Sequence, residues 1–193
     1  MPVVMRSVRG CTLTAVTNAL DVRLAVARIA RALARIDEDL VGYEPYENVV
    51  REPLPAQDVR AALESVAPSF RAPLIALYEA CDGIDAMNVN IGYHVRPLSE
   101  VVDQSPNPFE PVRLRTAGDA IKAFGSDGGG GLFALNERGE VLYLDHGSIE
   151  DGVFGDTPRS CRRVATDIAE FMERVSADAN AFVARKPGHR YMV

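Results

Sequence analysis

The sequence predicts a protein in which helices pack against a β-sheet. Three patterns indicate it: a long helical stripe of apolar residues near the N-terminus, two apolar runs joined by a polar turn around residue 138, and a capped amphipathic helix near the C-terminus. The 193 residues allow one domain plus an extension, since a typical domain has about 150. Hydrophobic residues at 47% and charged residues at 25% are typical of a globular chain and exclude a disordered or fibrous one.

A long helix is predicted from Thr12 to about Leu40. Apolar residues recur there at alternating spacings of four and three, and they form one stripe: Val22, Val26, Ile29, Leu33, Ile36 and Leu40. The stripe is either a coiled-coil or dimer seam, or the face with which an amphipathic helix lies on its own domain. It is shorter than the roughly three to four heptads that a coiled coil needs, which favours the second interpretation.

A proline-rich segment, residues 42–55, breaks the helical pattern. We therefore expect an N-terminal helical extension over residues 1–50, a main domain over 51–185 and a loose tail over 186–193. The main domain begins with two predicted helices. Val59, Leu63 and Val66 mark the first, and Ser69 is placed to cap the second, whose apolar residues are Phe70, Leu74, Leu77, Tyr78 and Cys81.

The pattern then changes to a period of two, which predicts a half-buried strand over Val89–Val95. A short helix follows over 97–102, a loop over 103–111 and a strand over 120–124. Leu132–Leu135 and Val141–Leu144 are apolar runs joined by four polar residues ending in glycine, which predicts a β-hairpin whose second strand is covered on both faces. Asp167 and Glu170 form a capping-box pair before the final helix.

The formal net charge of −6 makes the chain a poor candidate for binding the phosphate backbone of a nucleic acid and a better one for meeting a basic protein. Mild acidity also serves solubility alone, and that alternative stays open. The first residues lack the apolar run of a signal peptide, and no apolar run is long enough to span a membrane. We expect a cytoplasmic protein.

Catalytic and cofactor motifs are weak in this sequence. The run Gly128–Gly131 leads into a strand and not into a helix with a following lysine, so a turn is favoured over a phosphate-binding loop. Asp127, Asp145, His146 and Glu150 match no metal-ligand spacing. We predict no catalytic residue, no metal and no cofactor. The remaining enzyme hypothesis uses the glycine run with Asp145 and His146.

The order of short motifs resembles the SUKH superfamily, the Smi/Knr-like domain. The resemblance covers roughly residues 54–175. It rests on the helix end Tyr78–Ile84, the segment Arg96–Val101, the turn and strand Phe124–Leu135, the hairpin strand Gly139–His146 and the closing helix around Ile168–Met172. Two features depart from the family: the chain has no tryptophan, and its first fifty residues lie outside the match.

The resemblance implies an α+β fold, with a mostly antiparallel sheet and helices packed on it, and no catalytic activity. Bacterial members are commonly immunity proteins that bind and block a cognate polymorphic toxin such as a nuclease or deaminase. We therefore expect a protein-binding module with polar contact residues on an exposed sheet face and hairpin: Asp85, Asn88, His94, Glu137, Glu140, Asp145 and His146. The alternative is a regulatory or scaffold protein that forms a homodimer through the stripe from Val22 to Leu40.

Overall fold

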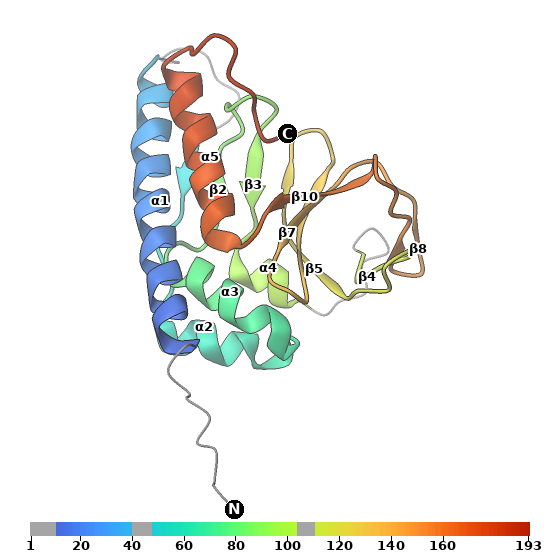
Figure 1. Cartoon of the computed structure of the whole chain (residues 1–193). Coiled ribbons are helices and arrows are strands. Elements are labelled where there is room, and N and C mark those ends of the chain that lie inside the picture. The colour runs from blue at the N-terminus through green and yellow to red at the C-terminus, as the bar shows by residue number, and fades with distance from the viewer. Residues whose placement is uncertain (1–10, 40–47, 104–110) are drawn as a thin grey trace, which may run out of the picture.

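The computed structural model describes residues 11–39, 48–103 and 111–193, and the side chains of residues 19–38, 48–103 and 111–193. Figure 1 shows helices on one side of a sheet, as the α+β prediction requires. The helical elements are α1 (Cys11–Asp39), α2 (Ala56–Ala62), the short 3₁₀ helix η1 (Leu63–Ser65), α3 (Pro68–Tyr78), α4 (Leu98–Val102) and α5 (Ile168–Val183).

Within the described residues the larger sheet has seven strands in the order β1-β2-β3-β5-β6-β7-β10, and every neighbouring pair is antiparallel. This confirms the mostly antiparallel sheet. Its strands are β1 (Val49–Val50), β2 (Ile84–Asp85), β3 (Tyr93–Val95), β5 (Ile121–Asp127), β6 (Leu132–Asn136), β7 (Val141–Leu144) and β10 (Cys161–Ala165). A smaller sheet, in the order β4-β9-β8, consists of Arg113–Leu114, Val153–Phe154 and Ile149–Glu150.

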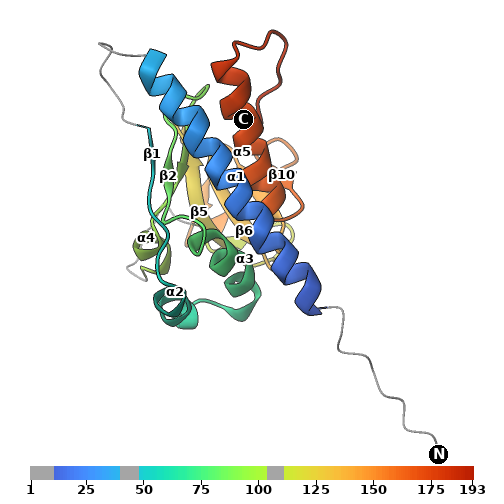
Figure 2. The same cartoon turned by 90° about the vertical axis from the view of Figure 1, so that its left-hand side faces the viewer.

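The apolar stripe of α1 is buried inside the chain. Val22 and Ile29 are fully buried in the same apolar core as Phe171 and Val175 of α5, and α1 and α5 lie side by side (Figures 1 and 2). The described part of the stripe is therefore not an exposed dimer seam, and Leu40 lies outside the described residues. The helix lies on its own domain because burial of this stripe removes its apolar surface from water.

Contacts cross the expected boundary near residue 50. Strand β1 pairs with β2 of the main domain. Arg28 of α1 forms an ion pair with Glu173 of α5, and the backbone N–H of Asn88 donates to Asn48 Oδ1 at 3.4 Å. The extension and the main domain thus share one core and one sheet.

Helices α2 and α3 lie where the sequence predicts them, with a different start for α3. Val59, Leu63 and Val66 are buried as expected. Helix α3 begins at Pro68 with Ala67 as its N-cap residue and no side-chain cap, so the predicted cap at Ser69 is wrong. Proline at the first helical position explains the earlier start, because its fixed φ already suits a helix and its missing N–H would have no helical partner there.

The predicted strand over 89–95 is shortened to Tyr93–Val95. Asn90 and Gly92 have φ of 54° and 97°, and these left-handed conformations turn the chain before the strand begins. Val89 is nevertheless fully buried beneath this turn. Ile91, by contrast, is 45% exposed, so the apolar alternation of the sequence does not mark a buried strand face before Tyr93.

The predicted hairpin forms from β6 and β7, and β7 contributes to two cores. Val141 and Tyr143 pack on the side of α5, whereas Leu142 and Leu144 pack against Leu114 of the smaller sheet and its neighbours. Coverage on both faces accounts for the continuous apolar run of this strand. The sequence did not predict the smaller sheet, whose strands are two residues long, or β10, which has five residues. Strands this short carry little periodicity.

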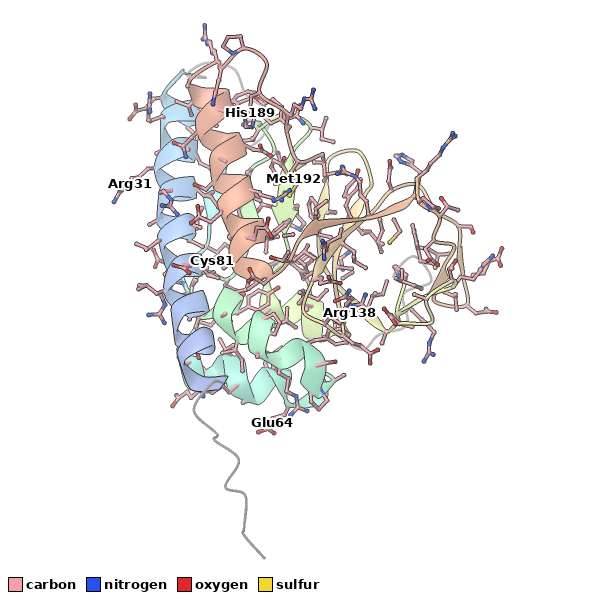
Figure 3. All side chains as sticks on the ribbon, in the orientation of Figure 1. Arg31, Glu64, Cys81, Arg138, His189 and Met192 are labelled. Carbon is pink, nitrogen blue, oxygen red and sulfur yellow. The ribbon has the colours of Figure 1, made fainter. Side chains whose placement is uncertain are left out.

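The C-terminal segment after α5 is anchored, contrary to the expectation of a loose tail. Asp178 of α5 is buried, and its carboxylate accepts hydrogen bonds from the Tyr93 hydroxyl and from the Met192 backbone N–H at 2.9 Å. His189 Nε2 lies 2.6 Å from the other carboxylate oxygen. Figure 3 shows His189 and Met192 on the segment that returns from the end of α5.

Candidate interaction surface

Two of the predicted contact residues meet on adjacent strands. Asp85 on β2 is in register with His94 on β3, and one Asp85 carboxylate oxygen contacts His94 Nδ1. The other accepts a hydrogen bond from Arg51 Nη2 at 2.5 Å. Arg51, Asp85 and His94 thus form a continuous network, with 36%, 20% and 28% of their side chains exposed.

This network lies on the face of β2 and β3 that is turned away from the helices. Ile84, Tyr93 and Val95, the strand neighbours of Asp85 and His94, belong to the core shared with α1 and α5. Alternation along a strand therefore directs Asp85 and His94 to the opposite side. We call this surface the β2–β3 face. In the described part of the chain, the smaller apolar core includes no residue of β2 or β3.

The β2–β3 face is built on hydrogen-bonded strands and extends to neighbouring polar groups. Ser126 on β5 is in register with His94, which places both on one face. Asn48 Oδ1 accepts from the Asn88 N–H at 3.4 Å, and the Asn48 amide donates to Asp37 of α1, so this bond ties the predicted contact residue Asn88 to the segment that contacts α1. Arg51 Nη1 is buried with no hydrogen-bond partner among the described residues. The sequence did not single out Arg51, because only the pairing of β1 with β2 brings it beside Asp85.

Glu140 is held inside the β6–β7 turn, whereas Glu137 is exposed there. Glu140 accepts from the Asn136 amide at 2.7 Å, from Arg163 at 2.7 Å and from Arg138 at 3.1 Å. These hydrogen bonds lower the pKa of Glu140 from 4.5 to about 2, with the Asn136 bond as the largest cause and the two arginines next. Glu140 therefore fixes the turn, and Glu137 is the freer of the two acids.

Asp145 and His146 follow the other end of β7. They contact each other through a carboxylate oxygen and Nδ1, and His146 has a φ of 46° and a side chain that is 76% exposed. The seven predicted residues consequently fall into three groups and not one. The hairpin turn and Asp145 are at opposite ends of β7, about 15 Å apart, and β3 is separated from β7 by two strands, also about 15 Å.

The glycine run forms a turn between β5 and β6 that is closed by its own carboxylate. Asp127 Oδ1 accepts from the N–H groups of Gly129 at 2.9 Å and Gly131 at 2.7 Å, and the Tyr143 hydroxyl donates to Oδ2 at 2.6 Å. The carboxylate thus occupies N–H groups that a phosphate would need, and its charge would repel one. Burial, followed by the bond to Asp127, raises the pKa of Tyr143.

A groove that the sequence did not predict lies between α1, α2 and α3. It has a volume of about 540 Å³, and its lining is mainly apolar, with Ala19, Leu20, Ile75 and Ala76 among the lining residues. Arg23, Arg60 and Glu79 line it as well. We call it the α1–α3 groove.

Among residues 11–39, 48–103 and 111–193, no three His, Cys, Asp or Glu side chains are grouped so that they could bind a metal ion. Over the same part of the chain, every helix is too short or too polar to cross a bilayer. No family model matches the sequence, and no curated protein matches it either.

Proposed function

We propose that the protein is a non-enzymatic protein-binding module, and specifically a bacterial immunity protein that binds and neutralises a cognate polymorphic toxin. Two observations support it. The motif order over residues 54–175 resembles the SUKH superfamily, and the antiparallel sheet backed by helices agrees with the fold that this resemblance implies.

The observation that carries the proposal is the Arg51–Asp85–His94 network on the β2–β3 face. Its three side chains are linked to one another and are all partly exposed, so they combine fixed geometry with access to a partner. Because the strands already hold these groups in place, little conformational entropy is lost when a partner binds. A guanidinium, a carboxylate and an imidazole together offer donors and an acceptor to polar groups of a toxin surface.

The proposed toxin is a basic protein, such as a nuclease or deaminase domain, in a bacterial cytoplasm. The net charge of −6 would attract it from a distance and speed the encounter, an effect that salt weakens. The alternative of self-association through the Val22–Leu40 stripe loses support because the described residues of that stripe are buried in the core of the same chain.

Co-expression with the product of the neighbouring gene tests the proposal. We expect the full-length protein to co-purify with that product and to rescue cells from its toxicity. His94→Ala removes a partly exposed side chain from the β2–β3 face and is expected to weaken the complex about tenfold or more, as for a contact residue near the centre of an interface.

His146→Ala is the matched control, since it removes an exposed histidine outside this face. Absence of both complex and rescue with the wild-type protein would contradict the proposed function. Equal affinities of the wild type and both variants would instead place the contact elsewhere.

A further inference from the structure

The outer face of α1 leaves apolar side chains exposed beside the α1–α3 groove. Leu20 and Leu24 are 58% and 50% exposed and lie one helical turn apart, on the side opposite the buried stripe. Leu20 also lines the groove, together with Ile75 of α3. An exposed apolar ridge that continues into an apolar groove is characteristic of a surface that binds a partner.

This surface carries positive charge on an otherwise acidic molecule. Arg23 and Arg60 both pair with Glu79, at 3.8 and 3.1 Å, so two guanidinium groups share one carboxylate. Arg31 and Arg35 lie exposed farther along α1, and Figure 3 shows Arg31 projecting away from the body of the molecule. The chain as a whole has a net charge of −6. Acids also lie on this helix, at Asp21, Asp37 and Glu38, so the positive charge is local to Arg23 and Arg60 at the groove and to Arg31 and Arg35 in the middle of the helix.

We propose that the α1–α3 groove and the Leu20–Leu24 ridge bind an acidic amphipathic helix of a partner protein. Apolar side chains of that helix, spaced three and four residues apart, would pack on Leu20 and Leu24 and enter the groove against Ile75. Its flanking carboxylates would pair with Arg23 and Arg60. This surface is separate from the β2–β3 face, and the proposal does not depend on the proposed function.

Charge favours this occupant over two others. Residues 1–10 of the chain contain Arg6 and Arg9 and no acid, so their insertion would add positive charge to a basic groove. A second copy that met the first through the same groove would bring its own Arg23 and Arg60 against those of the first. An acidic helix instead supplies the opposite charge and lowers the electrostatic free energy of the complex.

The test is a titration of the full-length, ¹⁵N-labelled protein with designed peptides, followed by two-dimensional NMR. One peptide of about 18 residues carries leucine at helical spacing and glutamate elsewhere. A second has lysine in place of glutamate, and a third has the residues of the first in scrambled order. We expect only the first to shift the amide signals of Leu20, Leu24, Ile75 and Ala76. Raising salt from about 50 to about 500 mM should weaken its binding.

Substitutions locate the site and its charge requirement. Leu24→Asp and Arg60→Glu are each expected to lower the affinity for the first peptide about tenfold. Leu24→Asp removes an apolar contact, and Arg60→Glu reverses a paired charge. Val112→Asp and Arg159→Glu are matched controls on the opposite side of the sheet and should leave the affinity unchanged; Val112 is 59% exposed, and Arg159 is exposed as well. All four substituted residues are exposed, so circular dichroism is expected to show that all four variants are folded.

Several results would overturn the proposal. If the lysine peptide bound equally well, charge would not select the partner. If the acidic peptide caused no shift of any amide signal at about 1 mM, the groove would not be a binding site for such a helix. Without peptide, Leu24→Asp should leave the signals of residues 3–9 and the mass from light scattering unchanged. A shift of those signals would assign the groove to the chain's own N-terminus, and a change from dimer to monomer would assign it to a second copy. His94→Ala should not affect peptide binding.

Discussion

Truncation of Ile29 tests whether α1 is an integral part of the fold. Ile29 is fully buried in the core that α1 shares with α5. Ile29→Ala removes three carbon atoms, worth about 0.8 kcal/mol each in transfer free energy, and leaves a cavity that the packed helices fill only in part. The better helix propensity of alanine returns a few tenths of a kcal/mol. We expect a net loss of about 3 kcal/mol in the free energy of unfolding.

Such a loss corresponds to a decrease of about 6 to 12 °C in the melting temperature of a chain of this size. Urea unfolding followed by circular dichroism measures the free energy, and scanning calorimetry shows whether the chain unfolds in one transition, as a shared core requires. Leu24→Ala is the matched control, because this side chain lies on the same helix but is 50% exposed. It should cost less than about 0.5 kcal/mol.

The reasoning would be refuted if Ile29→Ala cost no more than Leu24→Ala. It would also be refuted if calorimetry of the wild-type protein resolved a separate transition that Ile29→Ala shifts alone. Either result would mean that α1 unfolds independently of the sheet and α5, so that residues 1–50 form an extension with no shared core.

Four further outcomes are expected. Asp167→Ala removes the hydrogen bond that the Asp167 carboxylate accepts from the Glu170 N–H at 2.8 Å, and it should lower the free energy of unfolding in urea by about 1 kcal/mol. Asp167→Asn should keep most of this stability, because asparagine is also a good N-cap residue. Because the pKa of Glu140 is about 2 in the folded protein and 4.5 ordinarily, its contribution to stability is present above pH 4.5 and lost as the pH falls toward 2. Unfolding curves at several pH values should therefore show a weaker acid dependence for Glu140→Gln. Asp178→Asn should speed hydrogen exchange at the Met192 amide about tenfold, and unchanged exchange would argue against the anchor. Burial raises the pKa of the Cys81 thiol to about 11, so mass spectrometry should find it unmodified by iodoacetamide at neutral pH until the chain unfolds.

The elements that the sequence predicts well are those whose pattern is local and long. The α1 stripe, the β6–β7 hairpin and the cap of α5 each depend on residues close together in the chain, and the structure confirms all three. Strands β4, β8 and β9 are two residues long, which is too short for any periodicity. They exist because Leu114 and Phe154 cover the second face of the β5–β7 region.

The sequence predicted two of the three residues of the candidate network, Asp85 and His94, but not their arrangement. Asp85 and His94 were named for their polarity, but their contact depends on the register between β2 and β3. Arg51 completes the network from a segment that carries no motif. Glu140 was expected at a contact surface, yet the residues of its own turn and Arg163 already occupy its carboxylate.

The sequence by itself determined that the chain folds as helices against an antiparallel hairpin, since apolar spacing dictates which face of each helix or strand must leave water. It could not determine what each apolar face would meet. Whether the long stripe of α1 met α5 or another chain, and whether the last residues hung free or joined Asp178, depended on contacts between residues far apart in sequence. Those contacts form only when the complete core assembles, and so the tertiary structure alone decided which surfaces, among them the β2–β3 face and the α1–α3 groove, stayed open to solvent.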